Sequence, residues 1–128
     1  MRKLISAALL CIASLIIAPT SYAQAPDFTK TQALAEKGNP EAEYNLALLY
    51  HRGDGVAKDL ALEIKWLTRS AGQGYAPAQY NLGVMFDNGQ GVSKDPVQAT
   101  KWVAKAAEQG FPIAQRDLGL RYSEGKGV

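Results

Sequence analysis

The residues with the clearest chemical potential are Ser123 and Lys126, which lie in a Ser-Glu-Gly-Lys segment. Their spacing matches the Ser-x-x-Lys motif of penicillin-binding proteins and serine β-lactamases, in which the serine is the nucleophile. A nucleophilic serine is favoured at the positive, N-terminal end of a helix, whereas Ser123 is predicted at the trailing end of a helix, beside a glycine loop. The companion motifs are incomplete, because Phe-Asp-Asn at 86–88 and Lys-Thr-Gln at 30–32 each miss one residue. We therefore expect no enzymatic activity.

The sequence predicts no cofactor and no metal site. Glycine pairs that begin at Gly53, Gly89 and Gly125 resemble part of a nucleotide-binding fingerprint, but no third glycine and no strand accompany them. We expect these glycines to end helices. The aspartates do not form the series of oxygen ligands that a calcium-binding loop requires. His51 is the single histidine, so a multi-histidine zinc site is excluded, and near the end of its helix it is expected to complement the helix dipole.

The first 23 residues are predicted to be a cleavable signal peptide. A basic start at 1–3 precedes an apolar run from Leu4 to Ala18, and the small residues Ser21 and Ala23 follow at the spacing that signal peptidase reads. The run has 15 residues, fewer than the roughly 20 that a membrane-spanning helix requires. We expect cleavage after Ala23, a periplasmic or secreted protein, and membrane contact through the leader alone if it stays uncleaved.

The charge of the remaining chain disfavours some classes of partner. The full chain has 14 basic and 12 acidic side chains, and loss of Arg2 and Lys3 with the leader leaves 14 − 2 = 12 basic side chains against the same 12 acidic ones. A neutral domain has no overall field that attracts a phosphate backbone, so nucleic-acid binding is not expected. The leader also carries Cys11, the single cysteine, so the domain predicted at 24–128 must be stabilised by packing without a disulfide.

The elements that position any site repeat every 36 residues. Residues 41–76 and 77–112 align without a gap and are identical at 14 of 36 positions. A third copy covers 113–128, and residues 28–40 resemble the second half of a preceding unit. A fixed offset of this kind is typical of repeat proteins, in which each unit packs on its neighbours.

Each full unit is predicted to form two helices. Asn39, followed by proline, is a typical helix N-cap, and apolar residues then recur at helical spacing until Gly53. Asp59 is predicted to cap a second helix, which also ends at a glycine. The same pattern in the other units predicts six helices in an all-α, right-handed α-solenoid of antiparallel helix pairs. Trp66 and Trp102 are expected to face the partner helix.

The residues from Ala78 to Gly110 carry a family resemblance. Their pattern is Ala-x-Tyr-Asn-Leu-Gly-x-x-Phe, Gly-x-Gly-Val-x-Lys-Asp, Lys-Trp and Ala-Glu-Gln-Gly. It resembles the Sel-one-like repeat family, which is related to the tetratricopeptide repeats, over about residues 30–128. The resemblance implies an α-solenoid that holds other proteins together and is often exported in bacteria. The first unit departs from the pattern where Glu63 replaces the small Ala99, so we expect looser packing there or an outward-turned Glu63.

A second stripe along the first helix of each unit is a candidate binding surface. Tyr44 and Tyr80 lie on this stripe and are expected mainly in the core between repeats, because aromatic rings supply much of the packing area. Part of the stripe is expected to line a concave groove. Residues near helix ends that differ between units are the better candidates for partner contacts. The predicted partner-binding residues are His51, Arg52, Asp87, Asn88, Leu48 and Val84.

The last half-unit allows two interpretations. It has Arg116 where the earlier units have tyrosine, and Arg121 where they have an aliphatic residue, as an end cap with a polar outer face would require. Its glycine loop is also consistent with an array that has been cut short. Because fewer than three complete units are present, we expect self-association or partner-dependent folding.

The sequence supports three functions in decreasing order. An exported, non-enzymatic scaffold or adaptor, whose partner is another protein, comes first. A module that binds cell-wall glycan or peptide comes second, and a penicillin-interacting serine hydrolase comes last.

Overall fold

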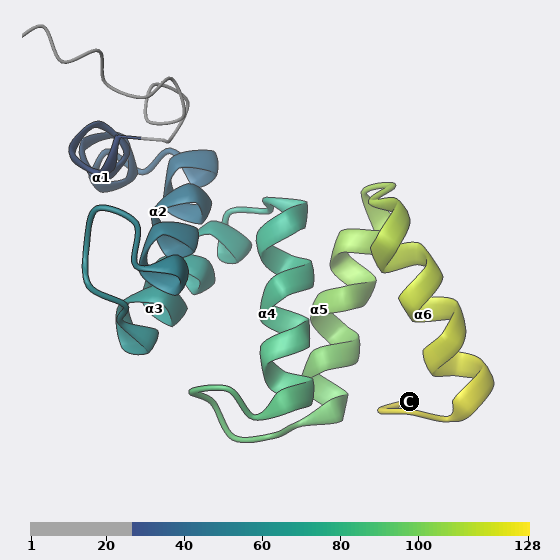
Figure 1. Ribbon diagram of the computed structural model, residues 1–128. Coiled ribbons are helices and arrows are strands. Elements are labelled where there is room, and N and C mark those ends of the chain that lie inside the picture. The colour runs from purple at the N-terminus through teal and green to yellow at the C-terminus, as the bar shows by residue number, and fades with distance from the viewer. Residues whose placement is uncertain (1–26) are drawn as a thin grey trace, which may run out of the picture.

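The structure is a computed structural model that describes residues 27–128, so the predicted leader and its cleavage site after Ala23 lie outside the described residues. This part of the chain contains six helices and no strand (Figure 1). The helices are α1 (Phe28–Glu36), α2 (Pro40–Arg52), α3 (Leu60–Gly72), α4 (Ala76–Asn88), α5 (Pro96–Glu108) and α6 (Pro112–Glu124).

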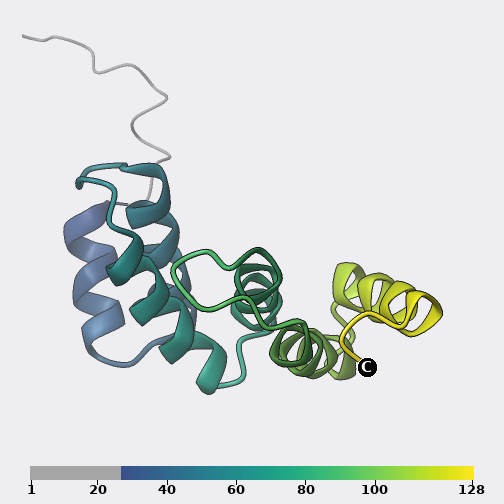
Figure 2. The ribbon, with the colours of Figure 1, turned by 90° about the horizontal axis from the view of Figure 1, so that it is seen from below.

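Consecutive helices pack against one another in a row. The pairs α2 with α3 and α4 with α5 make the most extensive contacts, and α3 with α4 joins one pair to the next. Figures 1 and 2 show the row running from α1 to α6. The predicted α-solenoid of helix pairs is confirmed. In the region that the structure describes, no helix is both long enough and apolar enough to cross a membrane.

The predicted capping residues begin the helices. Asn39 accepts a hydrogen bond from the Ala42 amide in α2 at 2.9 Å, and Asp59 accepts one from an amide in the first turn of α3 at 3.0 Å. Asp95 caps α5 in the same way. These side chains satisfy amides that the helix itself leaves free. At the far end of α2, Gly53 adopts a left-handed φ of 74°, which favours glycine and stops the helix.

The apolar core follows the row of helices. Leu46, Leu82 and Val103 are at most 2% exposed. Trp66 is buried and Trp102 is partly buried, and both pack against the core cluster of α2, α3 and α4. The prediction that both indole rings face inward is therefore confirmed. Because each helix is buried by its neighbours in the row, surfaces at the sides of the helices remain available for binding.

Candidate binding groove

Two adjoining hollows follow the side chains of α2, α4 and α6. The first hollow has a volume of about 210 Å³ and is lined by residues of α2, α3 and α4 together with Gln90. The second hollow has a volume of about 310 Å³ and is lined by residues of α4 and α6 together with Lys126. Val84 lines both hollows. We call the two hollows together the groove.

Aliphatic and thioether side chains form much of the first hollow. Leu48 enters from α2, Leu67 from α3, and Val84 and Met85 from α4. Leu67 and Met85 also belong to the core, whereas Leu48 and Val84 are partly exposed. The first hollow therefore offers apolar surface that continues from the core to solvent.

The polar rim of the first hollow includes His51 and Glu63. Nδ1 of His51 lies 3.0 Å from Oε1 of Glu63, and the Glu63 side chain is 14% exposed. The expectation of looser packing or an outward-turned Glu63 was wrong. Helix α3 stays closely packed on α2, because His51 on α2 gives the carboxylate a partner at the edge of the core.

The second hollow presents more exposed apolar surface. Ile113 is 45% exposed and Leu120 is 52% exposed. Tyr80 lines the same hollow, and its ring centroid lies 5.9 Å from that of Phe111. Burial first, and then the charge of Asp117, raises the pKa of Tyr80 above its ordinary value of 10.0. The tyrosine ring thus serves both the junction between repeats and the wall of the groove.

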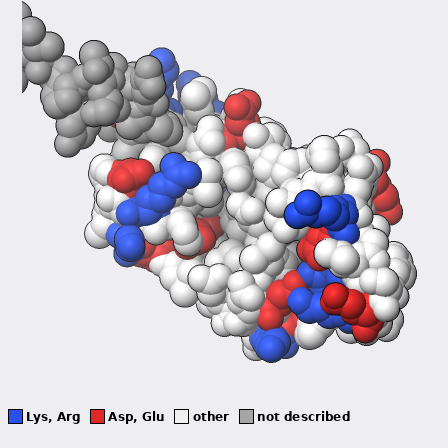
Figure 3. Space-filling view, turned by 45° about the vertical axis from the view of Figure 1, so that its right-hand side comes forward, with Lys and Arg blue, Asp and Glu red and all other residues white. Residues whose placement is uncertain are grey.

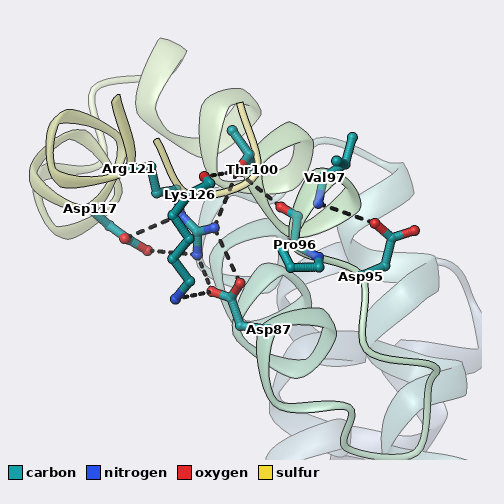
Figure 4. A network of polar contacts seen from close by, with 8 residues as sticks. All are labelled: Asp87, Asp95, Pro96, Val97, Thr100, Asp117, Arg121 and Lys126. Atoms are coloured by element: carbon teal, nitrogen blue, oxygen red, sulfur yellow. Dashed lines mark hydrogen bonds and ion pairs between the residues drawn. The ribbon is translucent and has the colours of Figure 1, made fainter. Parts of the chain in front are cut away.

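Arg121 connects α6 to α4 beside the second hollow (Figure 4). Its guanidinium donates hydrogen bonds to Asp87 and to Thr100, and its Nε lies 3.2 Å from Oδ1 of Asp117. Lys126 places its Nζ 3.6 Å from the Asp87 carboxylate. Burial alone lowers the pKa of Arg121, but the hydrogen bond to Asp87 and the charges of Asp117 and Asp87 raise it more. Its net pKa lies above the ordinary value, so the buried guanidinium stays charged.

This network corrects two expectations. Arg121 is not on a polar outer face, because it is 1% exposed and two carboxylates compensate its charge inside the molecule. Asp87, predicted as a partner contact, has a side chain that is 11% exposed and is engaged by Arg121 and Lys126. Its carboxylate is therefore not free for a partner. Arg116 is exposed, as its predicted place on the outer face requires.

The structure brings three of the predicted contacts together. Leu48, His51 and Val84 all line the first hollow. Arg52 and Asn88 are exposed at the ends of α2 and α4, and they line neither hollow. Partner binding by these five residues stays a prediction.

The groove also contains residues that were not predicted as contacts. Leu120, Ile113 and Arg116 line the second hollow on the α6 side. Leu120 follows Val84 by 36 residues, as Val84 follows Leu48. The repeat spacing alone could therefore have identified Leu120 as a groove residue.

The side chains of the Ser-x-x-Lys segment have other partners. The Ser123 hydroxyl donates a hydrogen bond to the Leu120 carbonyl at 2.9 Å in the last turn of α6. Lys126 is directed to Asp87 (Figure 4). Within residues 27–128, no group of three or more histidine, cysteine or acidic side chains is placed to hold a metal ion.

Charged side chains are mixed in sign on the face that Figure 3 presents. Basic and acidic groups lie next to each other there, and broad areas between them carry neither charge. This face has no large region of one sign, which agrees with the neutral charge expected for the domain without its leader.

Comparison with protein families identifies the repeats. The Sel1 repeat profile matches residues 40–75, 76–111 and 112–128. These segments begin one residue before the units predicted from the 36-residue offset. A comparison with curated proteins gave no match.

Solved structures share the fold. A protective antigen from uropathogenic Escherichia coli that displays an SLR fold matches with a TM-score of 0.77 and 42% identity, over 80% of this chain and 22% of that one. This chain thus spans about a fifth of that antigen. A Sel1 repeat protein from Oxalobacter formigenes matches with a TM-score of 0.76 and 37% identity, over 80% and 77% of the two chains. Cysteine-rich protein B from Helicobacter pylori, with a TM-score of 0.68 and 24% identity over 85% and 79%, supports the fold alone. Three consecutive profile matches within one helical array show that this chain belongs to the Sel1 repeat family.

Proposed function

We propose that this chain is an exported, non-enzymatic scaffold that binds another protein in the groove along α2, α4 and α6. Sel1 repeat proteins are generally scaffolds for protein interaction and generally not enzymes. One observation carries the proposal for this chain. The aliphatic side chains of Leu48, Val84 and Leu120 recur one repeat apart, reach the surface, and line two adjoining hollows.

The energetics favour a partner that covers apolar surface. Ile113 and Leu120 are each about half exposed in the second hollow, and removal of apolar surface from water stabilises a complex by about 25 cal/mol per Å². Such surface surrounded by polar groups is typical of binding sites. His51 and Arg116 supply polar groups beside the two hollows, and these groups can orient a bound segment.

Val84 provides the sharpest test because it lines both hollows. Replacement by aspartate places a charge in the middle of the groove. Val97→Asp is the matched control, because Val97 is 53% exposed on α5 and lines neither hollow. Wild-type protein and both variants are immobilised, periplasmic extract is passed over them, and bound proteins are identified by mass spectrometry. Circular dichroism confirms that both variants remain helical.

We expect the same specific proteins to bind the wild type and Val97→Asp, and to be lost from Val84→Asp. Recovery of the same proteins with Val84→Asp would exclude the groove as the binding site. If no protein binds and the chain instead sediments with purified cell wall, the scaffold proposal fails in favour of a wall-binding module.

The export part of the proposal has a separate test. The predicted leader is the feature that supports it. We expect the protein in the periplasmic or extracellular fraction, with an N-terminus at Gln24 by mass spectrometry. A cytosolic chain that retains residues 1–23 would contradict export and leave the groove proposal unaffected.

A further inference from the structure

The outer side of α6 reproduces the surface with which α4 receives α5. Four positions define this surface on α4, and three of the four residues are identical one repeat later on α6. The fourth changes from one aromatic residue to another. The α4 residues are Gln79, Leu82, Gly83 and Phe86, and their equivalents, which we call the outer face of α6, are Gln115, Leu118, Gly119 and Tyr122.

On α4 this surface is in tight contact with α5. A Cβ atom added to Gly83 would lie 2.9 Å from Cγ2 of Val103 and 3.0 Å from the carbonyl oxygen of Ala99, so the glycine lets the two helices approach closely. Near the other end of the contact, Nε2 of Gln109 donates a hydrogen bond to Oε1 of Gln79 at 2.8 Å. An apolar contact and an amide hydrogen bond therefore fix the register of α5 on α4.

On α6 the same surface is open. A Cβ atom added to Gly119 would meet nothing within 4 Å, and Tyr122 is 65% exposed. Nε2 of Gln115 donates to the Ala107 carbonyl at 3.2 Å, just as Nε2 of Gln79 donates to the equivalent carbonyl on α3. The Gln115 amide is thus held in the orientation that Gln79 has, but its Oε1 receives no donor from the described residues.

We propose that the outer face of α6 is a docking site for a helix of the α5 type that another polypeptide supplies. The α4–α5 contact defines the chemistry of that helix: alanine, then valine four residues later, and a carboxamide six residues after the valine, as at Ala99, Val103 and Gln109. The docked helix covers Leu118 and Tyr122 and donates a hydrogen bond to Gln115. This site shares no lining residue with the groove, so it is independent of the proposed function.

A second copy of this chain does not match that chemistry. Its α3 and α5 are already packed between neighbours, and α1 is the remaining helix of the same class. One or two repeats before Ala99, Val103 and Gln109, α1 and its flanks carry Asp27, Thr31 and Lys37. An aspartate replaces the alanine beside the close contact, and a lysine replaces the carboxamide.

A helical peptide with the α5 sequence tests the proposal. The probe is residues 93–111 with a hydrocarbon staple between positions 101 and 105, which are both exposed in α5 and four residues apart. The staple keeps the free peptide helical, since isolated helices of this length are marginal in water. The unlabelled peptide is titrated into the full, ¹⁵N-labelled chain, and amide signals are followed by NMR. We expect saturable shifts at the Gly119 backbone and the Gln115 side chain.

Two glycine variants give a matched comparison. Gly119→Leu fills the space where the docked helix must approach and should weaken peptide binding at least about tenfold, equivalent to about 1.4 kcal/mol. Gly72→Leu adds the same side chain at the end of α3, where a Cβ atom also meets nothing within 4 Å, and should leave binding unchanged. Neither substitution creates a clash within the chain.

The proposal is overturned if the helical peptide causes no saturable shift, or if Gly119→Leu binds the peptide as tightly as the wild type. It is also overturned if the Gly119 and Gln115 signals shift when the concentration of the chain alone is raised without peptide. In that case a second copy of the chain occupies the outer face.

Discussion

Arg121 joins two repeats through charge at a position where the earlier units use Leu49 and Met85. Arg121→Met restores the apolar residue type but leaves Asp87 without its main cation. Removal of one partner from a buried ion pair costs about 3–5 kcal/mol. Because Lys126 still lies near the carboxylate, we expect a loss of about 3 kcal/mol in the free energy of unfolding. Urea denaturation at pH 7 measures this loss.

Two further variants separate charge from packing. Arg52→Met changes an exposed arginine and should stay within about 0.5 kcal/mol of the wild type. The double variant Arg121→Met with Asp87→Leu removes both members of the pair and should recover most of the lost stability, because an apolar pair can replace a buried ion pair. If Arg121→Met alone is as stable as the wild type, the pair does not hold α6 to α4.

Tyr80 makes stability depend on pH in the alkaline range. Its pKa is raised in the folded state by burial and by Asp117, so folding favours the neutral phenol. This contribution is fully present below about pH 10, the value for an unfolded chain, and is lost as the pH rises through the folded pKa. We expect Tyr80→Phe to lose less stability than the wild type between about pH 9 and about pH 11 in urea denaturation. Tyr122→Phe, which changes a ring that is 65% exposed, is the control and should follow the wild type.

At the scale of helices, one glycine position should respond in opposite ways in two repeats. Gly83→Ala forces a Cβ atom to within 3.0 Å of α5 and should destabilise the chain by about 1–3 kcal/mol. Gly119→Ala meets open space inside a helix and should stabilise the chain by up to about 1 kcal/mol, because alanine has the higher helix propensity. Thermal denaturation followed by circular dichroism compares the two. Equal changes of the same sign would contradict the difference in packing between α4 and α6.

The helices could be predicted because their signals are local and repeat every 36 residues. Asn39 and Asp59 cap helices through amides within three residues, and Gly53 stops a helix by its own backbone conformation. The groove was predicted in part for the same reason, since Leu48 and Val84 occupy equivalent positions. Polar pairs between helices follow no such period. The bond from Arg121 to Asp87 spans 34 residues and that from His51 to Glu63 spans 12, so both depend on how the helices pack.

At the scale of the whole molecule, the arrangement in a row makes stability local. Each helix contacts chiefly the helices before and after it, and no single centre unites α1 with α6. In such arrays, stability is approximately a sum of the stabilities of the units and of their nearest-neighbour contacts. A substitution near α6 should therefore weaken that end of the row and leave the other end intact.

Hydrogen exchange of Arg121→Met tests this locality directly. The substitution removes the charge contacts that tie α6 to α4 and α5, so amides in α6 should exchange faster than in the wild type. Amides in α2 and α3 should keep their wild-type rates, because no contact of Arg121 reaches these helices. Mass spectrometry of peptic fragments resolves the two regions. A uniform rise in exchange across all six helices would show that the array opens as one cooperative unit, and the description of stability as a sum of neighbouring contacts would then fail for this chain.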